Sequence, residues 1–267
     1  MIIFKRELRR NLKYFIIWTA LMIIMFLYMA FLYPTMADQA ESMQSLVKGF
    51  PDALLKAFNL DLMMDFSDIT KYFAGEPYVL WLLFGSIFTM ILASGILSKE
   101  ESDGTIEFLL SKPVTRNKII TYKLLNTLFY VLAFNFILSL TAFAAVEAVK
   151  EGDYSRDKLL LLFAGALLVQ LTFAAIGFLI SVFIVKTKSV IPVSIGVVLG
   201  AYFLNTLAGM SDKTEQLKYL TPFKYVDARD ILLKGRFYGV YLLIIFIVII
   251  ISVVLSYVFY NKKDIRV

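Results

Sequence analysis

Carboxylate and amine side chains are the groups of this sequence that could transfer a proton, because the chain contains neither histidine nor cysteine. Imidazole catalysis, thiolate nucleophiles, disulfides and Cys/His zinc sites are therefore excluded. Two close pairs of acids occur, Glu100 with Glu101 and Asp61 with Asp65. Acid–base work by such a pair needs a nearby base or a set of metal ligands, and the sequence places neither beside them. We interpret both pairs as solvated charge and expect no catalytic residue and no metal site.

The sequence also lacks the phosphate-binding loop Gly-x-x-x-x-Gly-Lys-[Ser/Thr]. That loop uses backbone N–H groups and a lysine to hold the phosphates of ATP, so we do not expect this chain to bind ATP in that way. A membrane enzyme that works with carboxylates alone is the remaining catalytic alternative. The prediction is a chain that is not an enzyme in its own right and binds no cofactor directly.

The composition indicates a membrane protein. Apolar residues make up 60% of the 267 residues, and the mean hydropathy is +0.76, whereas soluble domains average about 45–50% apolar. A bilayer core needs roughly 20 apolar residues of helix, and helices satisfy their backbone groups within lipid. Six stretches without a charged residue meet this length: 14–33, 78–98, 124–146, 159–185, 189–210 and 239–260. We predict an all-α, polytopic fold with six transmembrane helices in a single domain over 1–267.

The distribution of lysine and arginine predicts the orientation of these spans. If the N-terminus is cytoplasmic, the inner segments 1–13, 99–123, 186–188 and 261–267 carry a net charge of +9. The outer segments 34–77, 147–158 and 211–238 then carry −3. Because cytoplasmic loops are enriched in cations, both termini are expected on the cytoplasmic side of the cell membrane.

Three segments outside the spans have helical patterns. Residues 2–13 are expected to form an interfacial helix, with Phe4, Leu8 and Leu12 on its apolar side and Arg6 and Arg9 on its basic side. Such a helix lies at the membrane surface, although the cations alone would also set the topology. The outer segment 34–77 has an amphipathic pattern, and short helices are expected within 211–238, including 227–234 with Gly235 as its C-cap.

The inner segment 99–123 is the most ordered connection in the sequence. Glu100, Glu101 and Asp103 form an acidic cluster, and Gly104 permits a sharp turn. A short helix is predicted over 105–111 and ends before Pro113. Thr115 is then expected to cap a helix that runs from 116 into the third span. A push on this segment would tilt the second and third spans together.

This segment resembles the coupling helix in permease subunits of type-2 ABC exporters. The residues that match the family pattern are Glu100, Glu101, Gly104, Thr105, Leu109, Leu110, Ser111, Pro113, Arg116 and Lys123. The resemblance covers the whole chain, because the basic start, the six spans and a Thr-Pro-Phe segment before the last span also fit. The alternative is a solvated charged loop without a functional role, which explains the acids but not the positions of Gly104, Pro113 and Thr115.

The resemblance implies a partner and a role for the segment. ATP and Mg²⁺ would be bound by a separate P-loop ATPase, present in two copies, which docks on residues 99–118 and on the N-terminal helix. The docking and coupling residues would be Glu100, Glu101, Asp103, Gly104, Thr105, Leu109, Leu110, Pro113 and Arg116. A second permease chain, identical or paralogous, and the lipid bilayer are the other implied partners, and no nucleic acid is expected.

The translocation route is less visible in the sequence. No span interior carries a charge, which argues against an ion or proton relay. The candidates for its lining are Trp18, Phe26, Phe84, Phe88, Asn126, Asn135, Gln170 and Asn205. The polar members could equally be interhelical hydrogen-bonding residues. An uncharged aromatic lining suits a hydrophobic or amphipathic cargo, such as a peptide, an antibiotic or a lipid-like molecule. A non-transporting scaffold or immunity protein is the alternative function.

Overall fold

The computed structural model describes residues 2–39, 42, 49–50, 68–102, 115–150, 152–210 and 212–263, and these contain helices but no strand. Six of the helices are long and apolar enough to cross a membrane, which confirms the predicted all-α, multi-pass fold. Their bounds are α1 (Ile2–Asp38), α5 (Glu76–Ser102), α7 (Arg116–Val149), α8 (Arg156–Ser181), α9 (Val190–Met210) and α11 (Gly239–Lys262).

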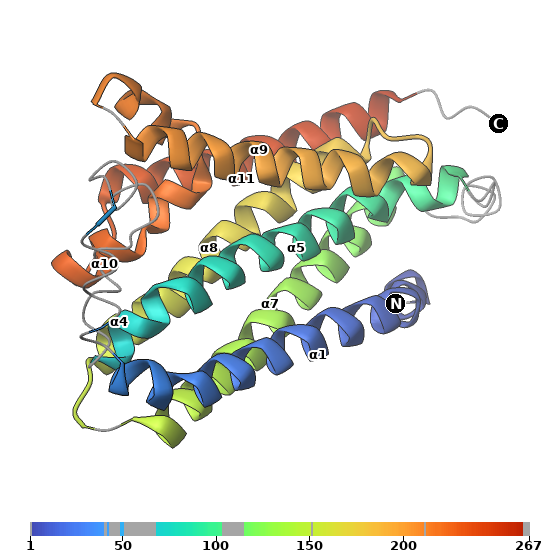
Figure 1. Cartoon of the computed structure of the whole chain (residues 1–267). Coiled ribbons are helices and arrows are strands. Elements are labelled where there is room, and N and C mark those ends of the chain that lie inside the picture. Colours follow the sequence, from blue (N-terminus) through green and yellow to red (C-terminus); the bar gives the residue numbers. More distant parts are fainter. Residues whose placement is uncertain are drawn as a thin grey trace.

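The six long helices form one bundle with α5 and α8 at its centre (Figure 1). Helix α1 packs mainly on α7, whereas α9 packs on α5 and α11 on α8. The most apolar window of α5 is 72% buried and that of α8 61%, against 17% in each of α1, α9 and α11. The three outer helices therefore present apolar side chains to their surroundings, as expected of helices solvated by lipid.

Both ends of the described chain lie at the same end of the bundle, together with the end of α5 and the start of α7 (Figure 1). We call this the terminal end, and the other the hairpin end. Six antiparallel passes produce this arrangement, and it agrees with the even number of predicted spans.

At the hairpin end, short helices cover the bundle: α4 (Ile69–Ala74), η3 (Asp212–Tyr219), η4 (Pro222–Val226) and α10 (Ala228–Lys234). The predicted cap of α10 is confirmed, because Asp227 accepts hydrogen bonds from the first turn and Gly235 adopts φ +62°, which glycine tolerates best. The amphipathic pattern predicted within 34–77 falls largely outside the described residues.

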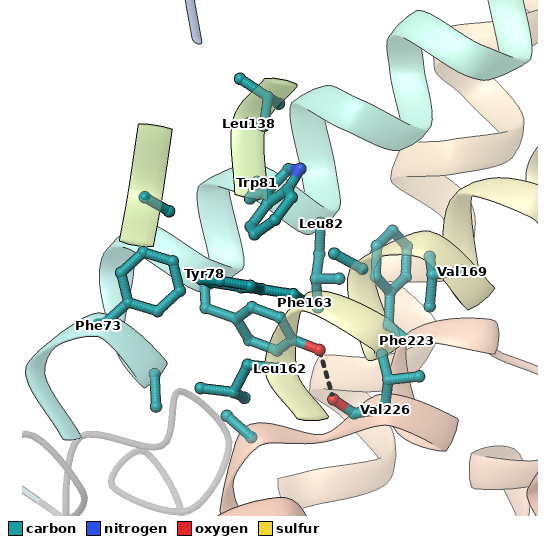
Figure 2. Close-up of a cluster of buried hydrophobic side chains, with 14 of the residues drawn as sticks. Phe73, Tyr78, Trp81, Leu82, Leu138, Leu162, Phe163, Val169, Phe223 and Val226 are labelled. Carbon is teal, nitrogen blue, oxygen red and sulfur yellow. Dashed lines mark hydrogen bonds between the residues drawn. The ribbon is translucent and has the colours of Figure 1, made fainter. Parts of the chain in front are cut away.

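Aromatic packing and a hydrogen bond hold two of these short helices, α4 and η4, against the central pair (Figure 2). The Trp81 ring of α5 lies 5.5 Å from the Phe163 ring of α8 and 6.4 Å from the Phe73 ring of α4, measured between centroids. The hydroxyl of Tyr78 donates to the carbonyl of Val226 in η4 at 3.1 Å. These buried rings add geometric preference to apolar burial and hold α4 and η4 in place.

The N-terminal segment differs from the expectation of a separate surface helix followed by a span. Helix α1 runs without interruption for 37 residues, with Pro34 inside its last turns. The side of its first turns that faces the bundle is centred on Glu7 and Asn11, both buried, whereas Leu12 is 46% exposed. Polar partners on α7 account for this rotation. The placement of residues 2–13 in the membrane interface stays a prediction.

Candidate functional site

The predicted coupling segment connects α5 to α7, whose adjoining ends lie at the terminal end of the bundle (Figure 1). Helix α5 ends at Ser102, and α7 begins at Arg116 after the N-cap Thr115, whose hydroxyl accepts from the Lys118 N–H at 3.4 Å. The predicted cap is therefore confirmed, and Glu100 and Glu101 lie in the last turn of α5. Asp103, Gly104, Thr105, Leu109, Leu110 and Pro113 lie outside the described residues, so the short helix over 105–111 stays a prediction.

A buried ion pair joins α1 to α7 beside this segment. The Lys123 ammonium lies 3.3 Å from the Glu7 carboxylate, and both side chains are 0% exposed. The same ammonium donates to the carbonyl of Ile96 in α5 at 2.5 Å. Arg10 contacts the second Glu7 oxygen at 3.0 Å from a 27% exposed position. One cation thus connects three helices, two of which lead directly into the coupling segment.

A second polar layer lies one turn further into the bundle. Asn11 follows Glu7 by four residues, and Asn126 follows Lys123 by three, so each pair shares a helix face. The Asn11 amide donates to the Asn126 carbonyl oxygen at 3.3 Å, and the Lys99 ammonium donates to the Asn11 oxygen at 3.1 Å. We call Glu7, Asn11, Lys99, Lys123 and Asn126 the α1–α5–α7 cluster.

Arg116 fastens the other side of α7 to the last helix. Its guanidinium donates to the carbonyls of Tyr260, Asn261 and Lys263 at 3.4, 3.1 and 2.8 Å. A cation at the C-terminal end of a helix satisfies its last carbonyls and its dipole. The Asn261 amide also donates to Asn117 at 2.6 Å. The first turn of α7 is therefore bound to the end of α11, a connection that we call the Arg116 cap.

The sequence alone did not reveal either connection, although signals were present. Glu7 was counted only as a charge within a basic segment, and Arg116 was assigned to partner docking. Glu7 and Asn11 are an acid and an amide four residues apart, and Lys123 and Asn126 are a lysine and an amide three residues apart. The two sets are complementary, which is a signal that their helix faces pack together. An arginine in the first turn of a helix opposes the helix dipole, which indicates a partner elsewhere.

These features fit one family of membrane proteins. Residues 1–265 match the sequence profile of the ABC-2 family transporter proteins. The chain belongs to the ABC-2 transporter permease family. No curated protein matches the chain. An ABC-2 permease is the membrane component of a transporter and is not itself catalytic, and the family implies an ABC ATPase as its partner. In the described part of the chain, no group of three or more acids could hold a metal ion.

The aromatic lining candidates of this ABC-2 permease have different environments. Phe26 and Phe88 are buried in the protomer, and Trp18 packs on Phe88 with ring centroids 6.1 Å apart. The Phe88 ring also lies 4.4 Å from that of Phe134. Phe84, in contrast, is 39% exposed. The structure therefore brings Trp18 and Phe88 together and leaves Phe84 on the outer surface of the chain.

The polar lining candidates lie at three separate places. Asn126 belongs to the α1–α5–α7 cluster. Asn135 of α7 donates to Gln170 of α8 at 2.8 Å, and both are buried, so they form an interhelical hydrogen bond. Asn205 lines a void of about 30 Å³ at the hairpin end with Tyr78. Asn126, Asn135 and Gln170 are therefore used in contacts between helices.

Proposed function

We propose that this chain is the membrane-spanning subunit of an ATP-driven exporter, moved by a separate P-loop ATPase that carries the ATP and Mg²⁺. The ATPase docks at the terminal end, within the expected range 99–118 and on the adjacent turns of α1; because Arg116 is held by the end of α11, we narrow the first of these surfaces to residues 99–115. The observation that carries the proposal is the position of the α1–α5–α7 cluster and the Arg116 cap. The helices α5 and α7 flank the coupling segment. The cluster binds both of them to α1, and the Arg116 cap binds α7 to α11.

The cluster supplies a path for motion. When the coupling segment moves, the end of α5 and the start of α7 move with it. The Lys123 ammonium then transmits the displacement to α1 through Glu7, and the Arg116 cap transmits it to α11. A packed network of this kind moves as a unit, because separating a buried charge from its partners costs several kcal/mol. Four of the six spans thus respond to one push.

Two permease chains, with both termini in the cytoplasm, and two ATPases complete the proposed exporter. ATP-driven closure of the ATPases favours one arrangement of the permeases, provided that the coupling segments make different contacts in the two states. The cargo is hydrophobic or amphipathic, since the helix surfaces that could meet between two protomers are apolar and uncharged. Exposed Phe31, Phe203 and Phe246 are examples on the three outer helices.

Co-purification with a P-loop ATPase, sought first in the open reading frames beside this gene, tests the docking. We expect the parent chain to retain the ATPase and Glu101→Lys to lose it, because the substitution reverses charge in the acidic turn. Asp153→Lys is the matched control: it makes the same change at an exposed position at the hairpin end and should leave the complex intact. Failure of the parent chain to bind any ATPase would support the non-transporting scaffold instead.

Coupling is measured separately in proteoliposomes that contain the complex. We expect ATP hydrolysis to increase with amphipathic peptides and not with soluble sugars or ions. A response to sugars or ions alone would overturn the assigned cargo class while leaving the docking result unaffected.

A further inference from the structure

A long apolar groove follows the outer side of α7. Its first hollow, of about 430 Å³, is lined by Phe4 of α1 and by Tyr122, Leu125, Leu128, Phe129 and Leu132 of α7. A second hollow of about 560 Å³ shares Phe129 and Leu132, continues along α7 to Asn135 and Ser139, and is bounded on its other side by Phe163 and Leu167 of α8. We call the first hollow the inner groove, because it begins at the terminal end of the bundle.

The inner groove has the length of one acyl chain. Tyr122, Leu125, Phe129 and Leu132 follow one another at three- and four-residue steps, so they lie on one face of the helix. The ten helical steps from Tyr122 to Leu132 span about 15 Å, which is half of a hydrocarbon core of about 30 Å. After the Tyr122 phenol at its start, polar side chains join the lining only beyond this stretch, at Asn135 and Ser139. The apolar part therefore matches a single leaflet.

A cation stands at the mouth of the inner groove. Lys118 precedes Tyr122 by one turn on the same face of α7 and is exposed. Lys5, also exposed, directly follows the lining residue Phe4. Within the described ranges, neither ammonium makes an ion pair with an acid. Lys118 also lies in the first turn of α7, where a cation opposes the helix dipole. Its position does not stabilise α7, and it favours an anionic partner from outside the chain.

We propose that the inner groove binds one anionic phospholipid of the bilayer. One acyl chain lies along Tyr122 to Leu132, and the phosphate meets Lys118 and Lys5. Tyr122 lines the groove one turn after Lys118, at the headgroup level where tyrosine is favoured. Charge complementarity at the mouth and the single-leaflet length select this occupant. The site needs only the membrane setting of the chain and does not depend on the ATPase or on the cargo.

Tryptophan quenching by brominated lipids tests the site. Leu125→Trp, at a 46% exposed position of the inner groove, reports on its occupant, and the signal of the two native tryptophans is subtracted from the parent chain. Val254→Trp, 54% exposed on α11 and eight residues from its end, is the matched reporter at a similar depth. Each variant is reconstituted in vesicles that contain brominated phosphatidylglycerol or brominated phosphatidylcholine.

We expect Leu125→Trp to be quenched with about fivefold preference for phosphatidylglycerol, the effect of one lysine near an anionic surface. Val254→Trp should show no preference. Adding Lys118→Glu should abolish the preference, whereas Lys188→Glu, the same change at an exposed terminal-end position of η2 (Thr187–Ser189), should preserve it.

Three results would overturn the proposal. The first is equal quenching of Leu125→Trp by both lipids. The second is an equal loss of preference in Lys118→Glu and Lys188→Glu, which would reflect net charge rather than a site. The third is quenching of Val254→Trp but not of Leu125→Trp, which would mean that another protein surface covers the groove.

Discussion

Replacing Lys123 with methionine tests how strongly the buried ion pair fastens α1 to α7. Both members of the Glu7–Lys123 pair are 0% exposed, and removing one partner of such a pair costs about 3–5 kcal/mol. Arg10 remains beside Glu7 at 3.0 Å and offsets part of this loss. We therefore expect destabilisation at the lower end, about 3 kcal/mol. At about 2–4 °C per kcal/mol for a chain of this size, the Tm should fall by roughly 6–12 °C.

The double variant Glu7→Gln with Lys123→Met separates the interaction between the two charges from the contacts that each side chain makes with the rest of the protein. It removes both charges, and neutral replacement of a buried pair is often close to neutral for stability. We expect the double variant to be more stable than Lys123→Met, with a coupling energy of about 2 kcal/mol or more. Thermal unfolding of the purified chain in detergent, followed by circular dichroism, supplies both values.

A matched control is available at the hairpin end. Lys150→Met breaks the Lys150–Glu147 pair, whose nitrogen and oxygen lie 2.6 Å apart and whose side chains are 32% and 27% exposed. Solvent-exposed pairs contribute little, so its Tm should not change measurably. If Lys123→Met unfolds at the same temperature as Lys150→Met, or if the two losses in the double variant simply add, the α1–α5–α7 cluster does not fasten these helices.

Three further outcomes are expected. Gly85→Ala should destabilise the chain by about 1 kcal/mol, because the new Cβ would lie 2.2 Å from the Gln170 amide nitrogen and push this side chain away from the hydrogen bond that its oxygen accepts from Asn135. Gly196→Ala, with open space around it, should not destabilise the chain, and equal melting temperatures of the two variants would contradict this. Arg116→Ala should cost about 1.5–3 kcal/mol and speed amide exchange at residues 260–263, whereas unchanged exchange would show that the cap contributes nothing. Burial and a hydrogen bond to a carboxylate raise the pKa of Tyr154. Its neutral form therefore contributes to the free energy of unfolding below the ordinary tyrosine pKa of about 10, and this contribution is lost as the pH rises through the raised pKa. Ultraviolet titration of the parent chain and Tyr154→Phe should differ by one tyrosine that ionises late.

The spans were predictable because lipid imposes a local requirement. A helix in hydrocarbon needs about 20 apolar residues, and that requirement is visible in any window of the sequence. Helix ends were predictable for a similar reason. Thr115 and Gly235 act on backbone groups within four residues, so their side-chain chemistry and φ preference were sufficient.

The α1–α5–α7 cluster was not predictable from periodicity, because its contacts join residues far apart in the chain. Glu7 and Lys123 are separated by 116 positions, and the carbonyl of Lys263 lies 147 positions from Arg116. Helical periodicity indicates which side chains share a face and not which helix that face meets. The apolar side of residues 2–13 was therefore placed on Phe4, Leu8 and Leu12, whereas the face turned to the bundle is centred on Glu7 and Asn11.

The uninterrupted α1 has a mechanical consequence. From Ile2 to Tyr33, before Pro34, the helix is about 48 Å long, which exceeds a hydrocarbon core of about 30 Å. If a helix of this length tilts as a rigid body by about 10°, one end is displaced by roughly 8 Å relative to the other. A sub-ångström shift at a short lever arm near Glu7 is thus enlarged at the far end of α1. Spin labels at Lys5 and Phe31 would report the two ends of that lever separately.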